Sequence, residues 1–571
     1  MSHWPERHLA VSPICIACHD YIEVNEVVFA LLGDASSANC SGFTKAFPFP
    51  QLGVGPTSLE EFMPCRYVGC SRCAESPEGF CVHVECFKLF QRACTTPHWL
   101  RLLFTSAAWM NPWSRMAPIT WVPPSQRMTL DINVFIYGAI KCGIRNVGRL
   151  PTEIVEMIRL HSTAGLMWRY MSVLSLAKNL LVSQPQDLVQ LPLIDMANWE
   201  RGGELCTEIR FRSSVMRISV DALGIKKIER FKEHPKKQIK SNGCFAFIIE
   251  KEENLCGFIV ELKDNFLRLS SLTTMINMRI WDTPCPPVQV ESTFLGKRIR
   301  HINFEDLSGL TFFYSSSCGG PCEIHAHTSK EPSAIWTFKR LPKELQQGVY
   351  WFFVPLTGGE RIRLVVTKSL RNPISNILIY TNLGRFSVLG YFRPEMPNIY
   401  SIEEEEEPDT LLYEDPDYGN GWTIPMLDVC GSRKLPLHET KIVTYLPPIC
   451  PLKDHYAAFY SRASLDSVRE ARVFLFTEDK GFCLGILFEY YDGTQRAVGQ
   501  CAPGIWPTVR FAEPKWFYYQ HIACNSGTCL SAFFTAEPLP HEQTLGLSCD
   551  EMSNKVVTFW MGRKESAIVV H

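Results

Sequence analysis

The sequence predicts a multi-domain α+β protein with a small zinc-stabilised N-terminal module, a short helical segment and a large antiparallel β-rich C-terminal region. Three observations predict this division. Cysteines crowd the first 94 residues, apolar residues at helical spacing follow residue 150, and from about residue 207 short apolar runs are separated by Pro, Gly, Asn and Asp. A chain of 571 residues has room for roughly two to four domains.

The composition is ordinary for globular domains, with 46% hydrophobic residues and a formal net charge of −2. This charge balance favours neither nucleic-acid binding nor wholesale disorder. No apolar stretch approaches the roughly 20 residues of a membrane-spanning helix, and the first residues lack the apolar core of a signal peptide. We therefore expect an intracellular protein, cytoplasmic or nuclear, with protein partners rather than a membrane or a nucleic acid.

The cysteines are unevenly distributed. Nine of the 23 lie at positions 15, 18, 40, 65, 70, 73, 81, 86 and 94. An odd total without a secretion signal argues against a disulfide framework. The other 14 (23 − 9) are scattered, mostly singly within apolar runs, and are expected to be small buried hydrophobic residues.

Three short pairs among the first residues have the spacing of zinc-binding knuckles, namely Cys15-x2-Cys18, Cys70-x2-Cys73 and His83-x2-Cys86. Zn²⁺ takes four sulfur or nitrogen ligands at tetrahedral corners, and each short loop can supply two of them. A catalytic zinc would need an open position and a general base, and no such base stands out. We therefore expect these six residues to bind structural zinc.

The pairing of these ligands stays open at this stage. Cys40, Cys65, Cys81 or Cys94 could complete a set of eight, so two interleaved sites and one site with spare cysteines both fit. The segment Cys81-x-His83-x2-Cys86 resembles the centre of a RING finger. However, 62 residues separate Cys18 from Cys81 and no C-x2-C pair follows Cys86, so docking of a ubiquitin-conjugating enzyme is not carried over.

Residues 150–182 resemble the first part of an F-box. The segment opens with Leu-Pro, continues with Glu-Ile and apolar residues at helical spacing, and has a Trp after a short break. The resemblance implies a helical module that docks on the Skp-type adaptor of a cullin ubiquitin ligase. The residues implied in that contact are Leu150, Pro151, Ile154, Ile158 and Trp168. A plain amphipathic helix pair that joins two domains is the alternative.

The C-terminal region is expected to form two β-rich domains, at 207–400 and 421–571, while residues 96–149 are a connecting region. Five consecutive glutamates at 403–407 repel one another, so residues 401–420 are predicted to be an acidic linker or loop. Apolar runs that end in a polar turn recur near residues 256, 376 and 485, which indicates repeated antiparallel hairpins. The last run, with its Asp492-Gly493 turn, is similar to hairpins of jacalin-like β-prism lectins.

The whole arrangement resembles a group of uncharacterised fungal proteins with an N-terminal Cys/His module, an F-box-like segment and a long β-rich region. The segments behind this resemblance are Cys15-Ile-Ala-Cys18, His83-Val-Glu-Cys86, the Leu150-Pro151 segment, residues 307–310 with His325-Ala-His327, and residues 484–493 with 497–500. It implies an organisation and not an activity.

Motifs that carry catalysis are missing from the sequence, which has no phosphate-binding loop, dinucleotide fingerprint, nucleophile elbow or H-E-x-x-H. The histidines of His325-x-His327 are expected to be partly exposed strand residues, and the paired cysteines at 318/322 and 524/529 to be loop thiols without an oriented base. We therefore expect a recognition or adaptor protein and no enzyme. The alternatives are an interaction or lectin-like protein with no ubiquitin link, and a cysteine- or metal-dependent enzyme in the β region.

Overall fold

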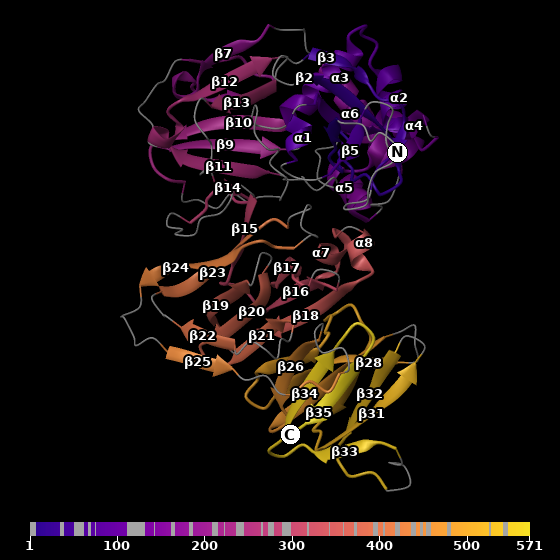
Figure 1. The fold of residues 1–571 in the computed structure, drawn as a ribbon, viewed down its shortest axis with the longest axis vertical. Coiled ribbons are helices and arrows are strands. Elements are labelled where there is room, and N and C mark those ends of the chain that lie inside the picture. The colour runs from indigo at the N-terminus through magenta and orange to yellow at the C-terminus, as the bar shows by residue number, and fades with distance from the viewer. Residues whose placement is uncertain are drawn as a thin grey trace. The chain divides into compact units, whose positions relative to one another are not determined.

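The structure is a computed structural model. It describes residues 7–34, 39–50, 62–66, 70–74, 76–110, 132–141, 143–161, 166–181, 187–207, 215–221, 223–235, 245–263, 266–271, 279–287, 298–316, 319–341, 343–357, 359–369, 374–391, 398–402, 406–416, 423–434, 441–445, 449–452, 458–476, 481–524, 527–540 and 546–571. The chain forms two compact units, Met1–Val288 with Thr293–Ile299, and Gln289–Ser292 with Arg300–His571. Figure 1 labels their elements.

The N-terminal part of unit 1 is a small mixed module. Its strands are β1 (His8–Ala10), β2 (Val27–Asp34), β3 (Asn39–Phe43), β4 (Phe47–Pro48), β5 (Met63–Cys65) and β6 (Glu78–His83), and its helices are α1 (Ser71–Ala74), α2 (Val84–Ala93) and α3 (Trp99–Met110). Strand β1 pairs with β5 in parallel, and β2 pairs with β3, β4 and β6 in antiparallel fashion. The end residues of β2, Val27 and Asp34, are exposed, whereas Val28, Ala30 and Leu31 are buried in the core of the module.

The helical segment follows, with α4 (Ile132–Lys141), η2 (Arg145–Arg149), α5 (Thr152–His161) and α6 (Leu166–Leu181). Helix α5 begins directly after Pro151, where a proline is tolerated because the first turn leaves its N–H groups unpaired. One face of α6 joins the core of the N-terminal module through Val173, Leu176 and Leu180. The expected module 1–95 is therefore too short, because α3 and α6 complete its core, and the connecting region 96–149 contains helices.

The rest of unit 1 is a pair of antiparallel sheets. The elements are β7 (Val189–Pro192), η3 (Leu193–Asp195), β8 (Trp199–Glu200), β9 (Val215–Asp221), β10 (Gly224–Phe231), β11 (Ala246–Lys251), η4 (Glu252–Leu255), β12 (Phe258–Lys263), β13 (Phe266–Ser271) and β14 (Ile280–Trp281). One sheet runs β14-β11-β9-β10-β8 and the other β13-β12-β7. Alternate residues from both sheets, such as Ile218 and Val260, form one shared core.

The first half of unit 2 begins within β15 (Arg298–Asn303). It continues with β16 (Gly309–Ser315), β17 (Pro321–His327), α7 (Ile335–Lys339), α8 (Lys343–Gln346), β18 (Val349–Pro355), β19 (Ile362–Ser369), β20 (Ile374–Thr381), β21 (Phe386–Gly390), β22 (Asn398–Ile402), β23 (Glu406–Glu414), β24 (Leu427–Lys434) and β25 (Lys441–Tyr445). Two of its sheets have the orders β17-β16-β18 and β19-β20-β21, β22 pairs with β25, and β23 with β24.

The second half of unit 2 consists of three antiparallel sheets. Its strands are β26 (Phe459–Ser464), β27 (Val468–Phe476), β28 (Phe482–Tyr490), β29 (Gln495–Gly499), β30 (Thr508–Ala512), β31 (Trp516–Cys524), β32 (Gly527–Thr535), β33 (Ser548–Glu551), β34 (Val556–Met561) and β35 (Ser566–Val570). The orders are β26-β34-β35, β29-β28-β27-β30 and β32-β31-β33. One continuous core runs from Ile302 to Ile568, so both halves of the unit share their hydrophobic interior.

Strands β22 and β23 occupy most of the described part of the expected linker at residues 401–420. Glu406 and Glu407 begin β23, while Glu403–Glu405 lie outside the described residues. Leu411, Leu412 and Tyr413 of β23 are buried in or beside the unit 2 core, and this burial favours a strand over an exposed linker. The observed boundary falls near residue 299, so the expected β-rich domain at 207–400 is divided between the two units.

The predicted hairpins are present. In β20–β21, Asn376 pairs with Gly390 and Tyr380 with Phe386, and in β28–β29 Gly485 pairs with Gly499 and Glu489 with Gln495. The two registers are the same at an offset of 109 residues (485 − 376 and 499 − 390). The third predicted run forms the hairpin β12–β13 in unit 1.

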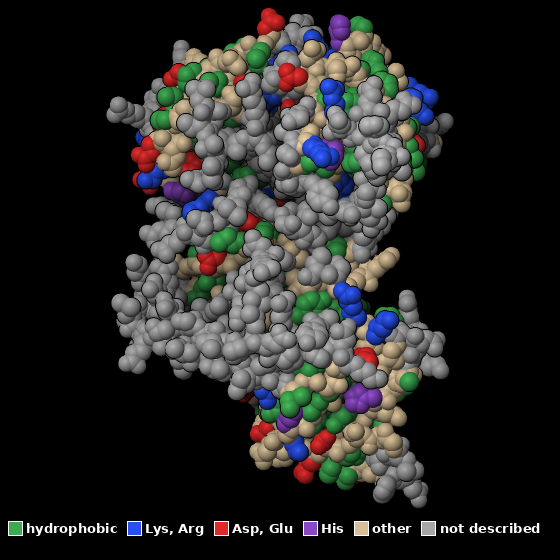
Figure 2. All heavy atoms as spheres, viewed as in Figure 1, with side chains coloured by type: hydrophobic (Ala, Val, Ile, Leu, Met, Phe, Trp, Pro, Cys, Tyr) green, Lys and Arg blue, Asp and Glu red, His purple; other side chains and the backbone are tan. Residues whose placement is uncertain are grey.

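The described helices contain no segment that is long and apolar enough to cross a membrane. On the face drawn in Figure 2, Lys and Arg side chains are interspersed with Asp and Glu side chains over the described surface. This mixture agrees with the formal net charge of −2.

Candidate metal centre

The first cluster consists of Cys15, Cys18, His83 and Cys86, whose ligand atoms all lie within 4.8 Å of one another. All four residues are buried. The His83 Nδ1 atom lies 3.5 Å from the Cys18 Sγ atom and 3.7 Å from the Cys86 Sγ atom. Three thiols and one imidazole therefore face a common centre and could hold a metal ion.

Local backbone structure positions these four side chains. Cys15 and Cys18 lie on a tight turn in which the His19 N–H donates to the Cys15 carbonyl, and the Ile16 N–H ties this turn to the Cys81 carbonyl of β6. His83 ends β6 and Cys86 lies in the first turn of α2. The positive end of the α2 dipole favours a thiolate at that position.

The close packing of these groups perturbs their proton affinities. Burial raises the pKa of the Cys15 thiol, but hydrogen bonds with Cys18, Cys86 and His83 outweigh burial and hold this pKa well below its usual value. Burial and the neighbouring thiols raise the pKa of Cys18. A cation at the centre is the group that would stabilise all three thiolates together.

A second layer of polar contacts orients His83. Its Nε2 atom donates to the Glu26 Oε2 atom over 3.1 Å, which leaves Nδ1 as the free ligand atom. Burial raises the pKa of Glu26, but the hydrogen bond from His83 and further contacts lower it to about 2. Arg169 on α6 forms ion pairs with Glu26 and Asp20, both at 3.5 Å, so the helical segment contacts the hydrogen-bond partner of a candidate metal ligand.

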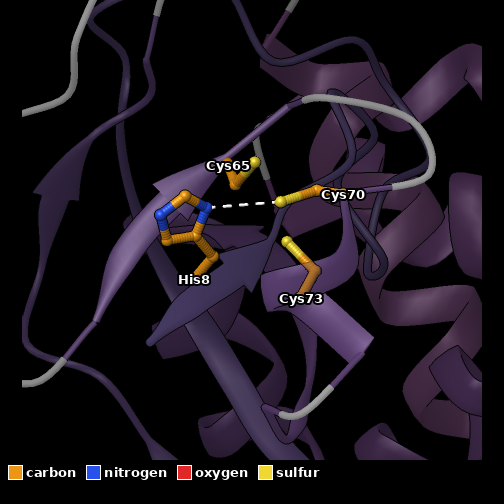
Figure 3. A group of neighbouring side chains, drawn as sticks. All are labelled: His8, Cys65, Cys70 and Cys73. Atoms are coloured by element: carbon orange, nitrogen blue, oxygen red, sulfur yellow. Dashed lines mark hydrogen bonds between the residues drawn. The ribbon is translucent and has the colours of Figure 1, made fainter. Parts of the chain in front are cut away.

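The second cluster consists of His8, Cys65, Cys70 and Cys73, and their ligand atoms also lie within 4.8 Å of one another (Figure 3). His8 begins β1 and Cys65 ends β5, and the parallel pairing of these strands brings the two residues together. Cys70 precedes the short helix α1, which contains Cys73, and the Cys70 Sγ atom lies 3.4 Å from the His8 Nδ1 atom. Cys65 is buried, whereas Cys70 and Cys73 are only half-buried.

The pKa values of the second cluster diverge in the same way. Burial raises the pKa of Cys70, but backbone hydrogen bonds from Cys73 and Arg72 and contacts with neighbouring thiols outweigh this and lower it. Burial and then the nearby Cys65 raise the pKa of Cys73 well above its usual value. The Cys70 thiol therefore ionises more readily than an isolated thiol. A bound cation would be needed to stabilise the thiolate of Cys73 as well.

The two clusters alternate along the chain. His8 belongs to the second, Cys15 and Cys18 to the first, Cys65, Cys70 and Cys73 to the second, and His83 and Cys86 to the first. Of the two arrangements that the sequence left open, the structure has the interleaved one. All six expected ligands lie in one cluster or the other, and Cys65 was among the candidates to complete them.

His8 was not among the ligands expected from the sequence. It lies 57 residues before Cys65 (65 − 8), outside any short knuckle, and only the β1–β5 pairing reveals it. Cys40, Cys81 and Cys94 lie outside both clusters, and Cys81 and Cys94 are buried hydrophobic residues of the N-terminal core.

The expected adaptor-binding residues divide into two groups. Leu150, Pro151, Ile154 and Ile158 are exposed. Trp168 is a correction, because it is only 9% exposed and its ring stacks on Phe135 at a centroid distance of 5.2 Å. The indole therefore belongs to the small core beneath α5 and is not part of an accessible surface.

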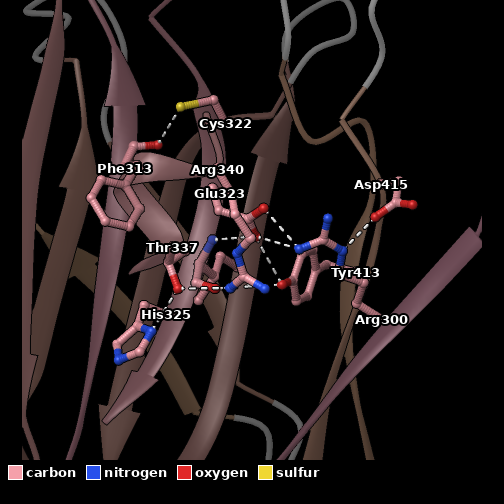
Figure 4. A network of polar contacts seen from close by, with 10 residues as sticks. Arg300, Phe313, Cys322, Glu323, His325, Thr337, Arg340, Tyr413 and Asp415 are labelled. Atoms are coloured by element: carbon pink, nitrogen blue, oxygen red, sulfur yellow. Dashed lines mark hydrogen bonds and ion pairs between the residues drawn. The ribbon is translucent and has the colours of Figure 1, made fainter. Parts of the chain in front are cut away.

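The polar groups of unit 2 that the sequence singled out have structural partners (Figure 4). His325 and His327 are buried rather than partly exposed, and each ring hydrogen-bonds a threonine hydroxyl and a backbone carbonyl. Arg300 donates to both oxygens of Glu323 and pairs with Asp415. Among the described residues, metal-ligand clusters occur only in the N-terminal module.

The paired cysteines also differ from expectation. Cys322 is buried and its thiol donates to the Phe313 carbonyl, and Cys529 is disulfide-bonded rather than a free loop thiol. Cys318 and the side chain of Cys524 lie outside the described residues.

No protein-family model and no curated protein matches the chain.

Proposed function

We propose that this chain is a non-catalytic recognition protein in which two structural zinc ions hold the N-terminal module and helix α5 docks on a protein partner. The observation that carries the proposal is a group of exposed apolar side chains on α5 and directly before it. Leu150 is 37% exposed, Ile154 40%, Met157 52% and Ile158 41%. Ile154, Met157 and Ile158 are spaced i, i+3 and i+4 and share one face of the helix, and Leu150 precedes its first turn.

A neighbouring face of α5 is anchored. Val155 is buried against the small core that contains Phe135 and Trp168, so the helix cannot turn its exposed apolar side chains inward. Helix α4 in the same segment also exposes Tyr137 and Ile140. A helix that is packed on one side and apolar on the other is typical of a surface that binds another protein.

Zinc is the metal that we propose for both clusters. Each has three sulfurs and one imidazole nitrogen, which is a donor set of tetrahedral structural zinc sites. Four protein ligands at each centre leave no position for a catalytic water, which supports a structural role. When bound, the first ion would fix the turn at Cys15–Cys18 to α2, and α2 packs on α6.

The partner that we propose is the Skp-type adaptor of a cullin ubiquitin ligase, with the β-rich units as the region that holds a target. The F-box-like pattern of residues 150–182 and the exposure of Leu150, Ile154 and Ile158 support this choice. Trp168 would act by supporting the helix from below.

The test is co-purification of the tagged full-length chain with a purified Skp-type adaptor. Leu150→Asp combined with Ile154→Asp places two charges among the exposed apolar side chains and is expected to abolish the interaction. Leu383→Asp is the matched control, because Leu383 is 47% exposed on a hairpin turn of unit 2. Absence of the adaptor with the wild-type chain would refute the ubiquitin-ligase link. Retention by the double variant would refute the role of α5.

Carbohydrate recognition without a ubiquitin link is a second candidate. The observation that favours it is the hairpin β28–β29, which resembles those of jacalin-like lectins and lies in a region of three antiparallel sheets. Binding of the intact chain to a glycan array would support this candidate, and a blank array would remove it.

A further inference from the structure

Four strands of unit 2 border a cavity of about 60 Å³. The strands are β18, β21, β26 and β29, and each is the edge strand of its own sheet. The side chains that line the cavity include Phe353, Glu360, Phe386 and Tyr460, together with hydroxyl groups and two arginines. Edges of four sheets therefore meet around one polar space.

The carboxylate in this lining is already engaged. The Glu360 side chain is only 1% exposed, and it accepts hydrogen bonds from Arg385 Nη1 over 3.1 Å and from Thr381 Oγ1 over 2.8 Å. Its negative charge is thus balanced by Arg385, which lies beside the cavity.

The lining holds two further guanidinium groups, that of the exposed Arg462 and that of the half-buried Arg496. Neither has a hydrogen bond or an ion pair within the described part of the chain, and the same holds for the hydroxyl group of Ser387. The carboxylates of Glu360 and Asp492 both act on Arg496, but Glu360 is paired with Arg385 and the exposed Asp492 is hydrogen-bonded to Thr494. The cavity therefore carries excess positive charge and unused donors.

The surroundings of Arg496 disfavour its charged form. Burial, followed by the like charge of Arg385, lowers the pKa of Arg496 to about 10. A partly buried cation without a direct ion pair destabilises a folded protein. Charged groups with strongly shifted pKa values concentrate at functional sites, where a ligand can supply the missing ion-pair partner.

We propose that this cavity binds a small ligand through a carboxylate or phosphate group, which accepts hydrogen bonds from Arg496, Arg462 and Ser387. A guanidinium group presents two parallel N–H donors that match either oxyanion. A water molecule needs roughly 10–15 Å³ of such a cavity, so the space fits one oxyanion group and not a whole nucleotide. Phe353 and Phe386 offer apolar contacts for the rest of the ligand. The proposal is independent of the docking role of α5.

The test is calorimetric titration of the full-length chain with inorganic phosphate and, separately, with acetate, at constant ionic strength set by chloride. At least one probe is expected to bind at a single site, and the probe that binds identifies the oxyanion. Arg496→Gln is expected to weaken that binding by about 10- to 100-fold, because it removes a charged bidentate donor. Arg510→Gln is the matched control, since Arg510 is an exposed arginine on β30 away from the cavity, and is expected to bind like wild type.

Three results would overturn the proposal. They are no binding of either probe to the wild-type chain, equal binding by Arg496→Gln, and equal loss in the Arg510→Gln control. A second test needs no variant, because it measures how fast phenylglyoxal modifies arginine residues of the wild-type chain. The bound probe is expected to slow modification of the peptide that contains Arg496 and to leave the Arg510 peptide unchanged. Equal rates with and without the probe would also overturn the proposal.

Discussion

Unit 2 is expected to lose stability below neutral pH because it buries two neutral histidines. Burial lowers the pKa of His325 to about 4, with a smaller contribution from Arg340, while a hydrogen bond with the Glu331 carbonyl opposes it. Burial likewise lowers the pKa of His327 to about 4, with a contribution from His325 and opposition from the Pro332 carbonyl. Protonation would place a charge where the ring now accepts a hydrogen bond from a threonine hydroxyl.

The sign and size of the effect follow from proton linkage. The pKa of each histidine is lower in the folded chain than the value of 6.5 that applies to the unfolded one, so the unfolded chain binds more protons between pH 6.5 and pH 4. The stabilisation is fully present above pH 6.5 and is lost as the pH falls through this window. At pH 5.5 each histidine is expected to lower the free energy of unfolding by about 1.4 kcal/mol, and two independent ones by about 3 kcal/mol.

Hydrogen exchange read by mass spectrometry on peptides from β16 and β17 would measure this loss between pH 7.5 and pH 5.5. The comparison is between the wild-type chain and the His325→Gln, His327→Gln double variant, which keeps hydrogen-bonding groups but cannot take up a proton. Contributions from the other titratable groups are common to both chains and cancel in the difference. The double variant is expected to show a pH dependence smaller by about 3 kcal/mol. Equal pH dependence in the two chains would refute the reasoning.

Two further changes test the first metal cluster and the repeated hairpin. Glu26→Gln removes the charged acceptor of the His83 ring and is expected to weaken metal binding by about 10- to 100-fold in competition with a chromophoric chelator, and an unchanged affinity would contradict the role of Glu26. Gly499→Ala is expected to destabilise unit 2 more than Gly493→Ala in urea unfolding. Both glycines have a positive φ, but a Cβ atom at Gly499 would lie 2.6 Å from the Leu484 carbonyl oxygen, whereas one at Gly493 would meet nothing within 4 Å. Equal losses in the two variants would show that this close approach is unimportant.

Features that depend on neighbouring residues could be predicted from the sequence. The C-x2-C and H-x2-C pairs, the helix start after Pro151 and the hairpin at Asp492-Gly493 each lie within a few residues, so their spacing carries the information. The structure confirms the hairpin and brings each short pair together.

Features that depend on distant parts of the chain could not be predicted. His8 reaches its cluster only because β1 pairs with β5, and the pairing of knuckles across 50 or more residues has no local signature. The acidic run misled the sequence argument, because repulsion between side chains is local whereas the burial of Leu411 and Leu412 depends on the rest of unit 2. The sequence around Trp168 is compatible both with an exposed residue of an F-box-like motif and with a buried core residue. Only the packing of its ring on Phe135 distinguishes these two roles.

The zinc content of the purified chain tests the central claim most directly. Native mass spectrometry is expected to find two zinc ions per wild-type chain, one for each cluster. Cys15→Ser with Cys18→Ser should lose the first ion, His8→Ala with Cys70→Ser should lose the second, and Cys40→Ser should keep both. A wild-type chain without stoichiometric zinc, or a loss of metal from the Cys40→Ser control, would contradict the account.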